Sequence, residues 1–141
     1  MKCFSKLLTV LCLALFAGSA VAANYNFITP DEMKAWIDRK QAFSIVDIQV
    51  EKEFALHHLP GSIATYAYPV KTDEERSAIA KAVEQYGKDG NPIVVVCPRG
   101  AGGAQRCYDY LKENNIPEEK LTILKGGIEG WPYKELLISG K

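Results

Sequence analysis

Apolar and polar residues follow one another in blocks whose period switches between helical and extended. Thr29 and Glu32 have the spacing of a capping box, and Pro30 suits the first turn of the helix that this box predicts. The apolar residues of the next turns share one face of that helix: Met33, Trp36 and Ile37. Helical spacing returns twice, and it predicts an amphipathic helix over residues 73–86 and another helix over residues 104–114.

Short apolar runs between the helices predict strands, at residues 43–48, 63–68, 93–96 and 121–124. Residues 93–96 read IVVV without alternation, which is expected where helices cover both faces of a sheet. Residues 50–57 predict a short helix whose Phe54 and Leu56 point inward. Since strands alternate with helices, we expect an α/β fold with an open, mostly parallel sheet and helices on both faces.

The first 23 residues have the three parts of a secretory signal. Lys2 and Lys6 precede an uncharged apolar run, and small residues follow it, so cleavage after Ala22 or Ala23 fits equally well. The apolar run is short for a membrane span. We therefore expect a signal peptide over residues 1–23, a single domain over residues 24–141, and a periplasmic or secreted protein.

Charge and hydropathy narrow the classes of partner. The chain has 17 basic and 17 acidic residues, and loss of Lys2 and Lys6 leaves a net charge of −2. Because no basic run remains, nucleic acid is not an expected partner, and the absence of a second apolar span predicts no membrane segment after cleavage. His57 and His58 are adjacent and without a Cys or His cluster, so no metal site is expected.

Cys97 follows the apolar run directly, at the edge where an open α/β sheet binds its ligands. Residues 100–103 read GAGG, and glycines let a loop curl so that several backbone N–H groups point inward. The N-terminus of the next helix adds a partial positive charge. We expect this loop to stabilise a Cys97 thiolate or persulfide anion.

Cys107 is the second cysteine of the predicted mature chain, because Cys3 and Cys12 belong to the signal. It falls on the apolar face of the helix after the loop, where core packing is its expected role. A thiol that resolves an oxidised Cys97 is the alternative. Asp47, near the end of a strand, is interpreted as a residue that fixes neighbouring backbone.

Four segments in order carry a family pattern: IVDI with EF at 45–48 and 53–54, HLPGSI at 58–63, CPRG at 97–100 and LKGGIEGW at 124–131. Together they resemble a single-domain rhodanese, a sulfurtransferase module, from about Asn26 to Leu137. The resemblance implies a rhodanese-like fold and a Cys97 that accepts a sulfane sulfur as a persulfide. It implies transfer to cyanide, a thiol or sulfide by double displacement, without metal or organic cofactor.

The loop residues expected to bind the substrate, a small sulfur-containing anion, are Arg99, Gly100, Ala101, Gly102 and Gly103. Many members of the family carry an arginine where this chain has Gly102, and often another where it has Gln49. The segment from Cys97 to Ile116 is also about one residue longer than the family pattern. Arg99 is therefore the candidate charge for selecting thiosulfate or polysulfide.

Two other readings stay open. The loop resembles that of some cysteine phosphatases and arsenate reductases. Such enzymes need an arginine to pair with a dianion, and this chain has Gly102 and Gly103 at the corresponding positions. A non-catalytic sulfur carrier or binding module would instead present the Cys97 persulfide, or an anion, to a protein partner. The sequence contains no pattern that sets an oligomeric state.

Overall fold

The computed structural model describes residues 23–141, and its strands form one sheet in the order β1-β5-β4-β2-β3. Every strand pair is parallel. The expected α/β class is thus confirmed. The elements are β1 (Phe27–Ile28), α1 (Pro30–Asp38), β2 (Ser44–Asp47), α2 (Glu51–Leu56), β3 (Ile63–Ala64), α3 (Asp73–Ala78), α4 (Ala80–Asp89), β4 (Ile93–Val96), α5 (Gly102–Glu113), β5 (Leu121–Leu124) and two 3-10 turns, η1 (Glu118–Lys120) and η2 (Lys134–Leu136).

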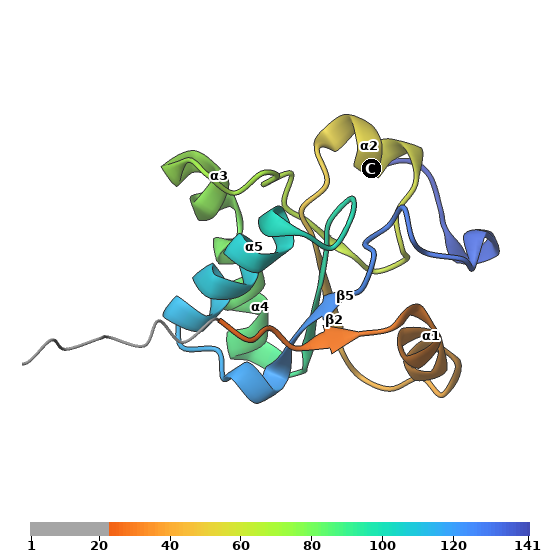
Figure 1. Ribbon diagram of the computed structural model, residues 1–141, viewed down its shortest axis with the longest axis horizontal. Coiled ribbons are helices and arrows are strands. Elements are labelled where there is room, and N and C mark those ends of the chain that lie inside the picture. The colour runs from red at the N-terminus through yellow and green to blue at the C-terminus, as the bar shows by residue number, and fades with distance from the viewer. Residues whose placement is uncertain (1–22) are drawn as a thin grey trace, which may run out of the picture.

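Helices cover both faces of the sheet, with α3, α4 and α5 on one side and α1 on the other (Figure 1). The four residues of β4 are all buried, and they alternate between the two cores. Ile93 and Val95 pack under α4 and α5, whereas Val94 and Val96 pack under α1. This double burial is what the unbroken apolar run predicts.

The predicted first helix is confirmed together with its cap. Thr29 Oγ1 accepts the Glu32 amide at 3.2 Å, and Glu32 Oε2 accepts the Thr29 amide at 2.8 Å. Met33 is fully buried on the sheet side of this helix. The predicted helix at residues 104–114 starts earlier, at Gly102, so the end of the glycine loop is itself the first turn of α5.

The predicted helix over residues 73–86 is wrong in its continuity. The chain bends at Ile79, whose amide donates to the Arg76 carbonyl three residues back, and so α3 ends and α4 begins there. Ile79 is fully buried. The bend lets its side chain reach the core, while no residue of α3 is buried.

Two further expectations need correction. Residues 63–68 do not form one strand, because Tyr66 adopts a positive φ of 56° and turns the chain out of the sheet, so β3 ends at Ala64. In α2, Phe54 is buried as expected, but Leu56 is 63% exposed. Leu56 is the last residue of a six-residue helix and follows Phe54 by only two positions, so the two side chains lie on nearly opposite sides of the helix.

The chain ends beside α2, where the Gly140 amide donates to the Ala55 carbonyl at 2.9 Å (Figure 1). Among the described residues, no helix has the length and apolar character needed to cross a membrane. The predicted signal peptide, with Cys3 and Cys12, lies outside the described residues apart from Ala23.

Candidate active site

Cys97 lies at the carboxyl end of β4, between that central strand and α5. The residue is only 2% exposed, and its Sγ accepts the N–H of Gly100 at an N···S distance of 2.8 Å. A backbone amide therefore points at the sulfur, as the glycine loop predicts. An N–H directed at sulfur stabilises the negative charge of a thiolate at that atom.

Gly100 can hold this position only because it lacks a side chain. Its φ is +72°, in the left-handed region, and a Cβ would stand 2.7 Å from the Leu124 carbonyl oxygen and 2.9 Å from the Gly126 amide. The chain after β5 thus packs directly against residues 97–101, which we call the cysteine loop. Two of the sequence motifs, CPRG and LKGGIEGW, meet at this contact.

The turn after β5 also fixes the first residues of the loop. The Ile128 amide donates to the Cys97 carbonyl at 2.9 Å, and the Glu129 amide donates to the Pro98 carbonyl at 3.0 Å. Gly127 has a φ of +61°, and a Cβ there would collide with the Cys97 carbonyl oxygen and the Arg99 amide. Gly126 and Gly127 therefore let the turn after β5 approach the residues after β4 closely. The hydrogen bonds from this turn then orient the cysteine loop.

The other predicted loop residues form the N-terminus of α5. Ala101 is the exposed N-cap and provides no side-chain hydrogen bond, so the first amides of α5 have no side-chain cap. Gly102 begins the helix. Gly103 is buried against Tyr68, and a Cβ there would stand 2.9 Å from the Tyr68 ring. The backbone N–H groups at the start of α5 have no side-chain cap, and so they favour the binding of an anion near Cys97.

Two arginines lie at this end of the molecule. Arg99, the sequence candidate, is exposed, and its role in binding stays a prediction. Arg106, which sequence reasoning missed, lies on α5 with Nη1 3.0 Å from the place where a Cβ on Gly102 would be. The signal was present, because residues four apart on a helix are neighbours on its surface and Arg106 follows Gly102 by four.

Asp47 is buried at the end of β2, and its bonds are structural. Its Oδ1 accepts the Gln49 amide at 2.9 Å and its Oδ2 accepts the Gln49 side-chain amide at 3.0 Å. Burial raises the pKa of Asp47 to about 6, although the bonds from Gln49 act in the opposite direction. The Gln49 amide nitrogen also reaches the His57 carbonyl, so the pair ties β2 to the end of α2.

Cys107 is completely buried in the core under α5. Burial, and then the nearby Cys97, raise the pKa of its thiol. Both cysteines of the described chain are free, so the geometry agrees with the packing role and contains no disulfide between Cys97 and Cys107. Within residues 23–141, no group of three or more His, Cys, Asp or Glu side chains is arranged to hold a metal ion.

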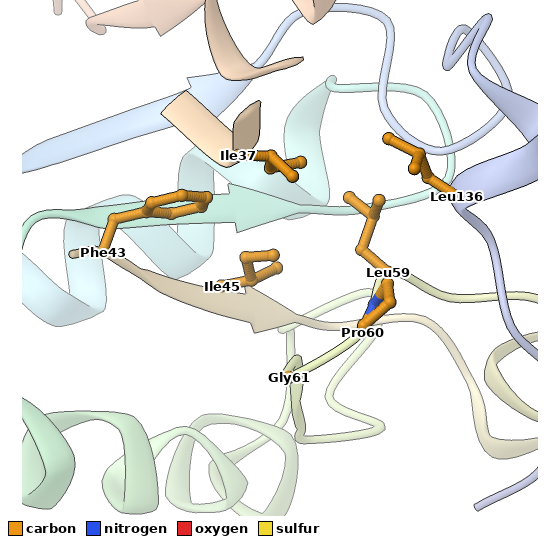
Figure 2. Close-up of a pocket in the computed structure, with 7 residues that line it drawn as sticks. All are labelled: Ile37, Phe43, Ile45, Leu59, Pro60, Gly61 and Leu136. Atoms are coloured by element: carbon orange, nitrogen blue, oxygen red, sulfur yellow. The ribbon is translucent and has the colours of Figure 1, made fainter. Parts of the chain in front are cut away.

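Two cavities bear on the location of the site. An apolar one of about 270 Å³ lies on the α1 face, away from Cys97, and Figure 2 shows the side chains of Ile37, Leu59 and Leu136 converging on it. A smaller one of about 230 Å³ lies beside the cysteine loop, lined by Gln49, Glu53, Leu56, His57, Pro98, Ile128 and Glu129. The second cavity adjoins the residue after Cys97, and the carboxylates of Glu53 and Glu129 lie at its wall.

Comparisons with known proteins identify similar folds and a family. The chain is similar to a rhodanese-like domain protein from Staphylococcus aureus, at 22% identity and a TM-score of 0.63 over 82% of this chain and 99% of that one. It is similar to a thiosulfate sulfurtransferase from Pseudomonas aeruginosa, at 18% identity and a TM-score of 0.61 over 83% of this chain and 20% of that one.

A third similar structure is an As-Sb reductase from Leishmania major, at 14% identity and a TM-score of 0.65 over 82% of this chain and 86% of that one. These likenesses establish the fold. No curated protein matches the sequence. The family model of the rhodanese-like domain matches residues 29–134, which is more than half of the chain. The protein therefore belongs to the rhodanese-like domain family.

Proposed function

We propose that this protein is an exported sulfurtransferase that carries sulfane sulfur as a persulfide on Cys97. The observation that carries the proposal is the Gly100 N–H directed at Cys97 Sγ at 2.8 Å, in a loop that opens onto the uncapped start of α5. Membership of the rhodanese-like family supports the reaction class. Export rests on the N-terminal sequence pattern alone.

The first half-reaction loads the cysteine. The Cys97 thiolate attacks the terminal sulfur of an anionic donor such as thiosulfate, the donor's S–S bond breaks, and sulfite leaves with the bonding electrons. The negative charge ends on the outer sulfur of the persulfide. The Gly100 amide, with Ala101, Gly102 and Gly103 at the helix start, would stabilise the anions at both stages. A polysulfide can load Cys97 in the same way, and a shorter polysulfide then leaves.

The second half-reaction returns the enzyme. A thiolate, cyanide or a protein thiol attacks the outer sulfur, and the Cys97 thiolate leaves with the electrons of the S–S bond. The chemistry requires neither metal nor organic cofactor. Pro98 has no N–H, so the donors around the sulfur come from the residues after it.

Intact-mass spectrometry of the mature chain tests the proposal. After exposure to thiosulfate or polysulfide, the protein should gain the mass of one sulfur atom, and peptide mapping should locate it on Cys97. Cyanide should then remove it as thiocyanate. Cys97→Ser should gain nothing, while Cys107→Ser should still load. A wild-type chain that gains no sulfur from either donor contradicts the proposal.

The same preparation separates the alternatives. A sulfur carrier would load Cys97 but would not pass the sulfur to cyanide or to a small thiol. A cysteine phosphatase or arsenate reductase would instead turn over an aryl phosphate or arsenate, and would lose that activity in Cys97→Ser.

A further inference from the structure

Arg106 places a guanidinium against the start of α5. Its Nε donates to the Pro69 carbonyl oxygen at 2.9 Å, which holds the side chain along the helix. The guanidinium carbon lies 3.6 Å, and Nη1 3.0 Å, from the position that a Cβ on Gly102 would take. Gly102 stands two residues after Gly100, whose amide contacts Cys97 Sγ. The charge therefore overlies the end of the cysteine loop.

The outer nitrogens of this guanidinium are available. Among residues 23–141, the side-chain bond of Arg106 is the one from Nε, and no carboxylate lies within ion-pair distance of it. The nearby carboxylate is Glu75, whose Oε2 already accepts the amides of Lys71 and Thr72 at 2.6 and 3.1 Å. The two outer nitrogens, with four N–H groups between them, thus remain for a ligand.

Another part of the surroundings of the loop carries charge of the opposite sign. The cavity beside Pro98 is lined by Glu53 and Glu129, and both carboxylates would repel an anion there. The Arg106 side combines a guanidinium with the free amides at the start of α5. An anionic donor is therefore attracted to the α5 side of Cys97.

We infer that Arg106 binds the oxyanion part of the sulfur donor while the sulfane sulfur faces Cys97. This inference rests on the proposed function and names the donor class: a sulfane sulfur attached to an oxyanion, as in thiosulfate. Guanidinium N–H groups pair with two oxygens of such a group at once. A polysulfide has no oxygens and gains only from the charge, so Arg106 selects between the two donors.

Kinetics of Arg106→Gln test the inference. We expect the KM for thiosulfate to rise about tenfold, as for loss of a hydrogen bond to a charged group, with kcat changing much less. Loading from polysulfide should fall less than loading from thiosulfate. Arg39→Gln is the matched control, because Arg39 is exposed at the end of α1 on the other face, and it should behave as wild type.

A charge swap distinguishes binding from a structural role. Gly102 is not in the left-handed region, and the atoms that crowd a Cβ there belong to Arg106 itself. In the double variant Gly102→Arg with Arg106→Gln, the guanidinium is carried by a side chain whose Cβ lies close to the position that the Arg106 guanidinium occupied. Recovery of the thiosulfate KM, although the bond to Pro69 stays lost, is the expected result.

Alkylation gives a readout that does not depend on sulfur transfer. Arg106→Gln should slow the reaction of Cys97 with iodoacetate several-fold more than its reaction with neutral iodoacetamide, as peptide mapping would show. If this ratio changes but no donor loads Cys97, the anion site stands and the proposed function fails. An unchanged ratio and KM, an equal slowing of both reagents, or a wild-type Cys97 that neither reagent reaches would each overturn the inference.

Discussion

Gly100 meets two requirements at once, a left-handed backbone and space for the turn after β5. Gly100→Ala should lower the free energy of unfolding by about 2–4 kcal/mol, because it adds left-handed strain and a Cβ that collides with backbone. It should also slow persulfide formation on the order of tenfold or more, since the amide moves from Cys97 Sγ. Urea denaturation and intact-mass kinetics measure the two effects.

Gly87→Ala is the matched control. Gly87 lies inside α4, and a Cβ there meets nothing within 4 Å. Alanine should raise stability by about 0.5–1 kcal/mol through its helix propensity and leave loading unchanged. Equal behaviour of the two variants would mean that Gly100 does not shape the loop.

Asp47 predicts a pH dependence of stability. Its carboxyl has a pKa of about 6 when folded, above the ordinary value of 3.8, because burial disfavours the charge. The folded state therefore binds the proton more tightly, so this contribution is complete below about pH 4 and is lost as the pH rises through 6. Between about pH 4 and pH 7, the wild type should lose about 2 kcal/mol that Asp47→Asn does not lose.

Urea denaturation across that pH range measures the difference. Glu74→Gln makes the same chemical change at an exposed position of α3 and should follow the wild-type profile. If Asp47→Asn keeps the wild-type slope, the carboxyl is ionised throughout and the account of its burial is wrong.

At the residue level, the sequence predicts features that depend on local backbone conformation and misses those that depend on long-range contacts. The tight turn at Gly100 was predictable because a close approach and a positive φ leave few other choices of residue. Arg106 was not singled out, because a charged residue on a helix is usually solvated, and its neighbour Pro69 is 37 residues away in sequence. Contacts at that separation depend on the fold, which local pattern does not specify.

Among the elements, α1 and the break at Ile79 mark where sequence reasoning succeeds and fails. The cap of α1 is a local bond between residues three apart, so its spacing can be read directly. No glycine or proline near Ile79 predicts the bend between α3 and α4. It forms because Ile79 is fully buried, a tertiary gain that overrides helical periodicity.

The shortened β3 has a similar origin. Thr65 donates both its amide and its hydroxyl to the Asp47 carbonyl at 3.0 Å, and the chain leaves the strand at Tyr66, which has a positive φ of 56°. The segment that follows then returns to β2, since the Tyr68 amide donates to the Ile48 carbonyl at 2.8 Å. This path brings Tyr68 against Gly103 and Pro69 against Arg106, so the element that sequence misjudged is one that supports α5.

Across the whole molecule, the sheet separates two cores that share its strands. Cys97 belongs to the core under α4 and α5, whereas Met33 belongs to the core under α1. The two cores lie on opposite faces of the sheet, so a change in one core should affect the other mainly through global stability. Stability and sulfur chemistry should therefore be separable.

Met33→Ala tests this separation, because Met33 is fully buried and removing its side chain leaves a cavity in the core under α1. The free energy of unfolding should fall by about 2–4 kcal/mol. Persulfide loading at Cys97 should stay within about twofold of wild type wherever the variant is folded, since the loop contacts from β5 and α5 are intact. Urea denaturation and intact-mass kinetics on one sample give both values. A loss of loading in proportion to the loss of stability would show that the α1 core also sets the geometry of the loop.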